Sequence, residues 1–366
     1  MNQYSTKKIS NFFLKKLFFN FICFIFMEIP KLWKPQDLFV IKSPKQSLRL
    51  VLLVFAVVCG IYILSMCINQ TSNYLLQAKS LSIHVINRHN CHYPIFQEED
   101  IHYLHFPKPQ TFTREECACN PVRFFAIFSM QRSGSGWFET LLNSHMNVSS
   151  NGEIFGAKSR RTNASVILEI MDSVFNLDWI SSSSKNECTA AIGFKWMLNQ
   201  GALEYHEEIV DYFNRRGVSA IFLFRRNLLR RLISLLANSY DKDAKPLNGT
   251  HKSHTHSPYE AKLLAKYKPL VNMSLLIPNL RNAQRKANRA LECFKSTRHI
   301  LLYYEDIVQN RTKLADVQEF LVLPQRELKS GQVKIHNGPL SQQIENWDEV
   351  QKKLKGTPYE TFLIKD

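Results

Sequence analysis

The sequence lacks several features that common functional classes require. No internal repeat is evident along the 366 residues, and no group of carboxylates is spaced as metal ligands would be. No matching Cys/His set accompanies the pair Cys117-x-Cys119, so the pair favours a structural disulfide role over a zinc site. Acidic residues are also few, 31 against 47 Lys and Arg, a balance that suits anionic ligands. We therefore expect no bound metal.

Charge is absent from one long stretch as well. Residues 50–68 are uncharged and mostly apolar, and their length is about what spans a bilayer core. Residues 1–49 carry nine Lys and Arg against two acids, and few basic residues follow the stretch. This asymmetry predicts a single transmembrane signal-anchor with a cytosolic tail at 1–49 and a lumenal remainder. A cleaved signal peptide is the competing interpretation, and Met27 is an alternative start to Met1.

Modification signals support the lumenal assignment. Five Cys follow the uncharged stretch, enough for two disulfides with one left over, and glycosylation triplets begin at six Asn. We expect a single-pass, type II glycoprotein of the Golgi membrane, for which nucleic acid is not a partner. The triplets begin at Asn69, Asn147, Asn163, Asn248, Asn272 and Asn310, and the cysteines are Cys91, Cys117, Cys119, Cys188 and Cys293.

The stretch Phe124–Leu142, FFAIFSMQRSGSGWFETLL, joins an apolar strand to a helix through a turn of small residues. N–H groups at a helix start and the helix dipole favour an anion there, and glycines let the backbone approach a phosphate closely. Arg132 adds a fixed positive fork. No Lys follows the glycines, as nucleoside-triphosphatase loops require, so ATP hydrolysis is disfavoured. The expected phosphate-binding residues are Gln131, Arg132, Ser133, Gly134, Ser135, Gly136 and Trp137.

Strands alternate with helices over most of the remainder, which predicts a parallel sheet. We expect an α/β fold, a P-loop-like parallel sheet sandwiched by helices, with ligands at the carboxyl ends of the strands. Changes of composition assign 69–120 to a lumenal stem, 121–352 to the main domain and 353–366 to a C-terminal tail. The expected strands are Ala191–Leu198, Ser219–Arg226 and His299–Val308, and the expected helices are Leu203–Arg216, Leu228–Ser239 and Leu314–Leu323.

A second strand–turn–helix stretch occurs at Phe224–Ser239, FRRNLLRRLISLLANS. Arg226 ends the strand, and Ser234 follows eight residues later in the helix. A basic helix start at the same sheet edge predicts a second phosphate site. A third basic turn, with Lys334 and His336, precedes a helix near the C-terminus.

These three pieces, in this order, resemble the sulfotransferases that use 3′-phosphoadenosine-5′-phosphosulfate (PAPS). Ser129–Leu142 is similar to the 5′-phosphosulfate loop of their carbohydrate and bacterial branch, and Arg226 through Ser234 is similar to their 3′-phosphate element. Together with GFKWM and GPLSQQIENWDEV, the pattern over Pro121 to Val350 is similar to plant proteins that resemble nodulation protein H. Gln131 stands where many relatives have Pro or Trp. The resemblance implies transfer of a sulfuryl group from PAPS to a hydroxyl of a glycan or another small acceptor.

The resemblance also implies roles for the residues that bind the donor. Arg132 and the loop amides would stabilise the leaving 5′-phosphate, because charge develops there as the sulfuryl group departs. Arg226 and Ser234 would bind the 3′-phosphate and select this donor over ATP. Lys334 would supply a further nucleotide contact.

The acceptor hydroxyl needs a base, and two residues are candidates. Glu153, in NGEIF, is the first, because a Glu in a similar neighbourhood is thought to serve in related bacterial enzymes. His145, at the end of the first helix, is the alternative. Lys195 lies in the apolar strand GFKWM, where a lysine is costly unless it meets an anion, so we expect it to reach the sulfuryl oxygens.

Two other functions stay open at this level. A P-loop nucleotide kinase or triphosphatase would share the phosphate loop, and a non-catalytic, membrane-anchored glycan-binding protein would share the fold. The basic insertion Asp241–His256 is expected to act as a lid over the strand ends. A metal site formed by His251, His254 and His256 is the less favoured interpretation of that insertion.

Overall fold

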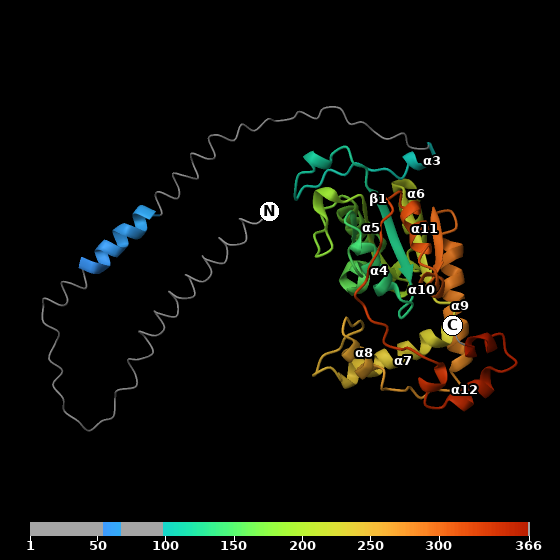
Figure 1. The fold of residues 1–366 in the computed structure, drawn as a ribbon. Coiled ribbons are helices and arrows are strands. Elements are labelled where there is room, and N and C mark those ends of the chain that lie inside the picture. The colour runs from blue at the N-terminus through green and yellow to red at the C-terminus, as the bar shows by residue number, and fades with distance from the viewer. Residues whose placement is uncertain (1–53, 67–97, 365–366) are drawn as a thin grey trace, which may run out of the picture. The chain divides into compact units, whose positions relative to one another are not determined.

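The computed structural model describes residues 54–66 and 98–364 (Figure 1). The chain divides into two units, 1–87 and 88–366, and the second contains the sheet described below. Of the predicted span 50–68, residues 54–66 are helical and both ends lie outside the described residues. Among the helices of the described ranges, none is long and apolar enough to cross a bilayer, so the span stays a prediction.

Five parallel strands form the sheet of the second unit, in the order β2-β3-β1-β4-β5. Phe125 of the central strand β1 is in register with Gly193 of β3 on one side and Ser219 of β4 on the other. The predicted α/β fold with a parallel sheet is confirmed. The strands are β1 (Arg123–Ser129), β2 (Val148–Ser150), β3 (Ala191–Met197), β4 (Val218–Phe224) and β5 (His299–Tyr303).

Helices cover both faces of the sheet, because successive side chains of a strand point to opposite faces. Phe124, Ala126 and Phe128 of β1 pack with α5, α6 and α9, whereas Phe125 and Ile127 pack with α4, α10 and α11. The longer helices are α4 (Ser135–Ser144), α5 (Ala164–Phe175), α6 (His206–Arg216), α7 (Leu228–Ala244), α9 (Leu276–Cys293), α11 (Lys313–Phe320) and α12 (Trp347–Leu354). The shorter ones are α3 (Glu98–Ile101), α8 (Pro258–Leu264), α10 (Tyr304–Gln309), η2 (Glu115–Cys117), η3 (Ile154–Gly156), η4 (Lys158–Arg161), η5 (Asn186–Cys188), η6 (Leu198–Ala202), η7 (Leu340–Gln342) and η8 (Glu360–Leu363).

One expected strand ends earlier than the apolar pattern indicates. The predicted strand His299–Val308 stops at Tyr303, and α10 begins at the next residue. Glu305 and Asp306 occupy the first turn of α10, where acidic side chains favour a helix start. The apolar Ile307 and Val308 therefore continue a helix rather than the strand.

Segments expected outside the main domain pack against it. In the predicted stem, His105 pairs with Val122 through two backbone hydrogen bonds, just before β1. In the predicted tail, Tyr359 is buried and the Phe362 carbonyl accepts a hydrogen bond from Asn227 Nδ2. Both ends of the second unit thus contribute to its core.

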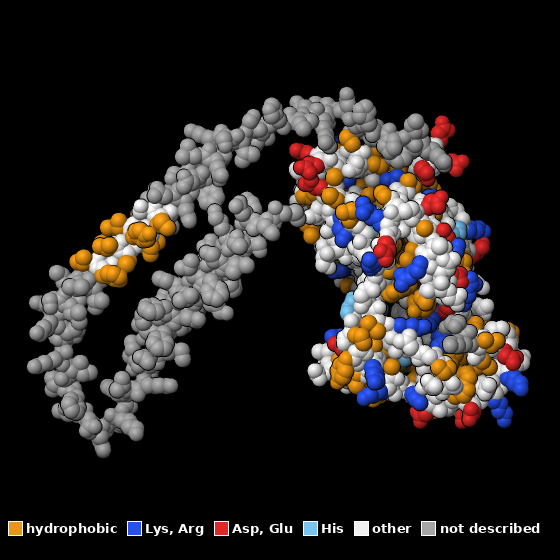
Figure 2. Space-filling view, in the orientation of Figure 1, with side chains coloured by type: hydrophobic (Ala, Val, Ile, Leu, Met, Phe, Trp, Pro, Cys, Tyr) orange, Lys and Arg blue, Asp and Glu red, His pale blue; other side chains and the backbone are white. Residues whose placement is uncertain are grey.

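The carboxyl ends of the strands face a second group of helices. Figure 1 shows α7, α8 and α12 lying beyond the end of the β1 arrow. In the same view, Figure 2 shows this unit narrowing between the sheet and those helices, with Lys and Arg side chains on the narrowed surface. The residues considered next lie between these two parts.

Candidate functional site

The turn between β1 and α4 has the backbone of an open anion-binding loop. Arg132 and Gly134 have φ values of 65° and 84°, both in the left-handed region. Gly134 is the N-cap of α4 and provides no side-chain hydrogen bond, so the first N–H groups of the helix have no side-chain cap. A Cβ at Gly134 would lie 2.3 Å from Tyr304 Cδ2, so only glycine fits there.

The Arg132 side chain is fixed by contacts outside its own loop. Its Nε donates to Ser234 Oγ of α7 at 2.9 Å, and its Nη1 donates to the Ser253 carbonyl at 2.7 Å and to Asn238 Oδ1 at 3.4 Å. Burial lowers the pKa of Arg132 to about 10, which leaves the guanidinium cationic at neutral pH. Arg132 and Ser234, predicted for opposite ends of the donor, are therefore in direct contact.

The second basic turn presents a different arginine from the one predicted. Arg226 bonds Asp306 through two guanidinium nitrogens, stacks on Tyr303 with its Cζ 3.9 Å from the ring centre, and keeps 55% of its side chain exposed. Arg225 instead lines the cavity described below, with its Nε 3.3 Å from the buried Glu305 Oε1. The residues at the strand end alternate in direction, so the neighbouring arginine takes the inward position.

Most of the predicted residues meet around one cavity of about 460 Å³. Gln131, Arg132, Gly134, Ser135, Trp137, Glu153, Ser234 and Lys334 all line it. Ser133 and Gly136 are buried within the loop and do not line it. The other lining residues are Met197, Arg225, Leu235, Asn238, Ser253, His254, Tyr304, Val308, Arg311, Gln332, Val333, Ile335 and His336.

Three cationic side chains of the cavity contact a pair of aromatic rings, Trp137 and Tyr304. Trp137 meets Tyr304 edge to face, with ring centres 5.6 Å apart. The Arg225 Cζ lies 5.0 Å from the Tyr304 ring centre, and the Arg311 Cζ lies 5.4 Å from that of Trp137. Lys334 Nζ is 5.9 Å from the Tyr304 ring centre. This wall therefore combines flat apolar surface with positive charge, a combination that suits an aromatic anion.

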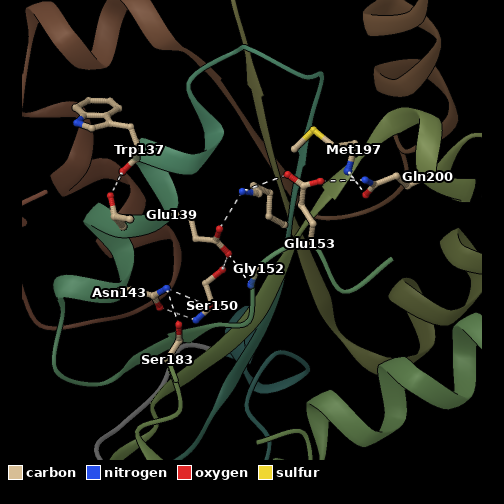
Figure 3. A network of polar contacts seen from close by, with 11 residues as sticks. Trp137, Glu139, Asn143, Ser150, Gly152, Glu153, Ser183, Met197 and Gln200 are labelled. Atoms are coloured by element: carbon tan, nitrogen blue, oxygen red, sulfur yellow. Dashed lines mark hydrogen bonds and ion pairs between the residues drawn. The ribbon is translucent and has the colours of Figure 1, made fainter. Parts of the chain in front are cut away.

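Lys195 contacts two carboxylates, those of Glu139 and Glu153, and these two residues are labelled in Figure 3. Its Nζ lies 3.1 Å from Glu139 Oε2 and 3.4 Å from Glu153 Oε1, and its side chain is 8% exposed. Glu139 Oε1 also accepts hydrogen bonds from Ser150 Oγ and the Gly152 N–H, both at 2.8 Å. A lysine at this depth needs such partners, because an unpaired buried charge is strongly unfavourable.

Glu153 is held at both oxygens. Lys195 contacts Oε1, and Gln200 Nε2 donates to Oε2 at 2.9 Å, while Gln200 Oε1 accepts from the Met197 N–H at 3.3 Å. The alternative base, His145, is buried away from the cavity, with its Nε2 3.1 Å from the Pro324 carbonyl and its Nδ1 accepting from the Asn147 N–H. Of the two predicted bases, only Glu153 reaches the cavity.

Two histidines that the sequence did not suggest as donor-binding or base residues line the cavity. Burial, followed by Arg132 and Lys195, lowers the pKa of His254 to about 4. Burial and the same Arg132, with Arg225 and Lys334, lower the pKa of His336 to about 4. Both imidazoles are therefore neutral near pH 7. The insertion that contains His254 does lie against the cavity, through Ser253 and His254.

Sequence reasoning missed several of these contacts. Glu139 follows the buried Phe138 on α4, and a carboxyl beside the core face of a helix is the signal that could have found it. Arg225 could have been found only as one of two adjacent arginines. Asn238 lies four residues beyond Ser234, one helical turn along the same face. Nothing in the local sequence singled out His254 over its neighbours.

The described part of the chain holds a disulfide-bonded cysteine and no metal-binding group of side chains. Among residues 54–66 and 98–364, no three His, Cys, Asp or Glu side chains gather as a metal site would require. Cys119 is disulfide-bonded, whereas Cys117, Cys188 and Cys293 are free. Cys117 and Cys188 nonetheless contact each other, and burial together with Cys188 raises the pKa of the Cys117 thiol.

Comparison with known proteins gives one curated relative. Nodulation protein H of Rhizobium meliloti is 24% identical over 252 residues, which are 66% of this chain and 96% of that protein. No protein-family model matches the chain. The relative, a sulfotransferase, agrees with the family to which the loop residues are similar.

Solved sulfotransferase structures are also similar, though weakly. A mouse sulfotransferase complexed with PAP is 13% identical, covering 55% of this chain and 60% of its own, with a TM-score of 0.32. The enzyme from Alicyclobacillus acidocaldarius is 12% identical over 66% of this chain and 96% of its own, at 0.34. A sulfotransferase domain from the curacin biosynthetic pathway is 15% identical, covering 59% of this chain and 78% of its own, with a TM-score of 0.29. The likeness of this chain to sulfotransferases rests on the curated relative and on the loop residues, and not on these TM-scores.

Proposed function

We propose that this chain, a sulfotransferase related to Nodulation protein H, moves a sulfuryl group from PAPS to a hydroxyl of a glycan or another small acceptor. The observation that carries the proposal is the single cavity on which Arg132, Arg225 and Lys334 converge. PAPS is an anion at both its phosphosulfate and its 3′-phosphate, so it needs cations at two places. The turn also lacks the Lys of a triphosphatase loop, which favours this donor over ATP.

The 5′ end of the donor would lie at the start of α4. Sulfuryl transfer is an in-line displacement in which the enzyme positions the reactants and stabilises spreading negative charge. Arg132 and the uncapped N–H groups of the first turn would bind the leaving 5′-phosphate. Because Ser234 and Ser253 already orient the Arg132 guanidinium, little rearrangement is needed as the charge develops.

For the 3′-phosphate we propose Arg225 and Ser234, with Lys334 as a further contact. Arg225 lines the cavity, whereas Arg226, favoured by the sequence, is engaged by Asp306. The Trp137–Tyr304 pair would provide apolar surface for the adenine. Arg226 keeps a role under this proposal only if donor binding releases it from Asp306.

Glu153 and Lys195 would act at the transfer end of the cavity. Glu153, the base predicted from the sequence, lines the cavity, and its contact with Lys195 would orient it toward the acceptor. The predicted contact of Lys195 with the sulfuryl oxygens would require it to loosen its contact with one of its two carboxylates.

Calorimetry of the purified full-length chain with 3′-phosphoadenosine-5′-phosphate (PAP) and with ATP tests the donor assignment. We expect micromolar binding of PAP and at least about tenfold weaker binding of ATP. Arg132→Ala should abolish PAP binding, whereas Arg215→Ala, an exposed arginine of α6, should leave it intact. Preference for ATP, or no PAP binding, would refute the sulfotransferase proposal. The alternatives, a kinase-like enzyme or a non-catalytic protein, would then be favoured.

The paired variants Arg225→Ala and Arg226→Ala test the second phosphate site. We expect the loss at Arg225 to weaken PAP binding by about tenfold or more, and the loss at Arg226 by less than about threefold. A thermal unfolding scan of each variant separates a lost contact from a lost fold. The reverse order of effects would restore the assignment made from the sequence.

The Golgi membrane location is a further part of this proposal. The basic tail at 1–49, the uncharged stretch 50–68 and the glycosylation triplets support a type II orientation with the described second unit in the lumen. Treatment of the expressed protein with an N-glycosidase should increase its mobility, and Asn163→Gln should remove part of that change. A protein whose mobility does not change would contradict the lumenal orientation.

A further inference from the structure

We propose that His254 takes the proton from the acceptor hydroxyl during sulfuryl transfer, which makes it the general base of this enzyme. The inference rests on the proposed function and deepens it. It names a catalytic residue on the insertion between α7 and α8, which matches none of the motifs that carry the family resemblance.

His254 stands at the start of α4, where the phosphosulfate is proposed to bind. It lines the cavity, and a Cβ placed on Gly136 would lie 2.6 Å from both its Cε1 and its Nε2. Only a glycine at this position leaves room for the imidazole against the loop. The Nε2 edge of the ring is thus held next to the first turn of the helix, beside the place at which the sulfuryl group is transferred.

Two separate elements fix the segment on either side of His254. The preceding carbonyl, that of Ser253, accepts a hydrogen bond from Arg132 Nη1 at 2.7 Å. The following residue, Thr255, pairs with Val333, whose N–H donates to the Thr255 carbonyl at 2.9 Å. The position of the ring is therefore tied to the phosphate loop on one side and to the Lys334 turn on the other.

The carboxylate predicted from the sequence as the base, that of Glu153, is engaged. Both Glu153 oxygens are occupied, one by Lys195 and one by Gln200. A carboxylate oxygen that already accepts an ion pair or a hydrogen bond has fewer lone pairs free for a new proton. Within the described residues, no hydrogen bond to either ring nitrogen of His254 is found, and the residue lines the cavity that the acceptor would enter.

The charges around His254 fit a base that is neutral before the donor binds. Arg132, Lys195 and His256 disfavour its imidazolium form, as burial does, whereas Glu153 favours it. His254 is an exposed residue whose ring packs against Gly136, so solvent reaches it at the mouth of the cavity. An anionic donor bound to Arg132 offsets these cations, which raises the His254 pKa when the hydroxyl must be deprotonated.

The proposed step is balanced without a metal or a redox partner. The acceptor oxygen forms a bond to sulfur while the bond between sulfur and the bridging oxygen of the 5′-phosphate breaks. The hydroxyl proton passes to His254 Nε2, and the electron pair of the broken bond leaves on PAP. The imidazolium then gives its proton to water, which restores the neutral ring.

The test compares His254→Asn with Glu153→Gln in the full-length chain. PAP release from PAPS is measured from pH 4 to 9, with water and then with neutral oligosaccharides as acceptors, and PAP affinity is measured by calorimetry. We expect His254→Asn to slow PAP release by about 100-fold at pH 7 while PAP affinity stays within about twofold. His256→Asn, an exposed histidine of the same segment, is the matched control and should keep its rate.

The pH profile distinguishes a base from a merely structural residue. The base must be unprotonated, so the wild-type rate should fall about tenfold per pH unit below the His254 pKa in the donor complex. His254→Asn should lack this acid limb, and Glu153→Gln should retain it. If Glu153→Gln removes the limb and His254→Asn keeps it, the proposal is wrong and Glu153 is the base.

Loss of PAP affinity in His254→Asn, in proportion to the loss of rate, would also overturn the proposal, because it would make His254 a donor contact. Failure of the wild-type chain to bind PAP would instead refute the proposed function itself. The two failures are therefore distinguishable.

Discussion

Two strand–turn–helix units lie side by side at the centre of the sheet, β1 with α4 and β4 with α7. Both consist of an apolar strand, a turn with arginine and a helix that begins at the same sheet edge. From the sequence, each is expected to bind a phosphate at its helix start. The structure distinguishes them by what already occupies that start.

Side chains of the protein already accept hydrogen bonds from the backbone N–H groups of the β4–α7 turn. Asn227 caps α7, accepting at Oδ1 from the Arg230 N–H at 3.0 Å. Glu305 accepts from the N–H groups of Arg226 at 2.9 Å and Asn227 at 3.3 Å. The β1–α4 turn has Gly134 at the equivalent place and no such cap. Only the first helix can therefore offer its amides to a ligand, while the second contributes side chains.

The largest effect should follow from removing the internal anion of the second turn. Glu305 is 7% exposed and pairs with Arg225, so Glu305→Ala leaves a buried arginine without its carboxylate. We expect about 3 kcal/mol of destabilisation, measured by urea unfolding. Asp306→Ala, next to it, breaks only the exposed pair with Arg226 and should cost less than about 1 kcal/mol. Equal losses would show that the second turn does not depend on its buried anion.

A side chain introduced into the β1–α4 turn should weaken donor binding rather than the stability of the fold. Gly134→Ala combines a left-handed backbone with a contact at 2.3 Å to the Tyr304 ring, so the loop must shift. We expect PAP affinity to fall by about 30-fold, close to 2 kcal/mol, in calorimetry. Gly356→Ala has a similar φ of 74° with open space around it and serves as the control for backbone strain alone. Unchanged PAP affinity in Gly134→Ala would contradict the proposed loop.

The cap itself gives a smaller effect. Asn227→Ala removes the side-chain acceptor of α7 and the hydrogen bond to the Phe362 carbonyl, and should destabilise the protein by about 1 to 2 kcal/mol, with PAP affinity unchanged within about twofold. Asn163→Ala removes only the equivalent cap of α5, remote from the cavity, and should cost about 1 kcal/mol or less. Thermal unfolding and calorimetry measure the two quantities. A gain in PAP affinity for Asn227→Ala would mean that the uncapped second helix can also bind the anion.

The smallest effect concerns the contact that joins the two units. Ser234→Ala removes the acceptor of the Arg132 Nε at 2.9 Å. We expect about fivefold weaker PAP binding, near 1 kcal/mol, because Arg132 keeps its bonds to Ser253 and Asn238. Ser239→Ala, exposed on the same helix, should change nothing. A loss as large as that expected for Arg132→Ala would show that Ser253 and Asn238 cannot hold Arg132 in place without Ser234.

Local patterns predicted the framework of both units well. The strand and helix of each are fixed by runs of apolar residues and by the period at which they repeat, and these are properties of short windows. The loop at Gln131–Gly136 and its place at the strand ends followed from the same reasoning, and eight of the predicted site residues line the cavity. β2 and α5 were not predicted, because their sequences were not distinguished from those of the loops on either side.

Side-chain partners were harder to predict because they come from distant parts of the chain. Lys195 was correctly expected to need an anion, yet Glu139, which contacts it, lies 56 positions earlier and carries no local signal. The choice between Arg225 and Arg226 depends on Glu305 and Asp306, which arrive from the start of α10. His254 reaches the phosphate loop only because contacts on both sides hold its segment there.

The sequence by itself thus determined the parallel sheet and the two turns at its edge, and it predicted an anionic ligand, since each depends on composition and spacing within one stretch. Only the tertiary structure decided which helix start stays open, which arginine faces the cavity and which histidine lies against the phosphate loop. Those outcomes depend on groups far apart in the chain, because burial and charge act through space and not along the sequence.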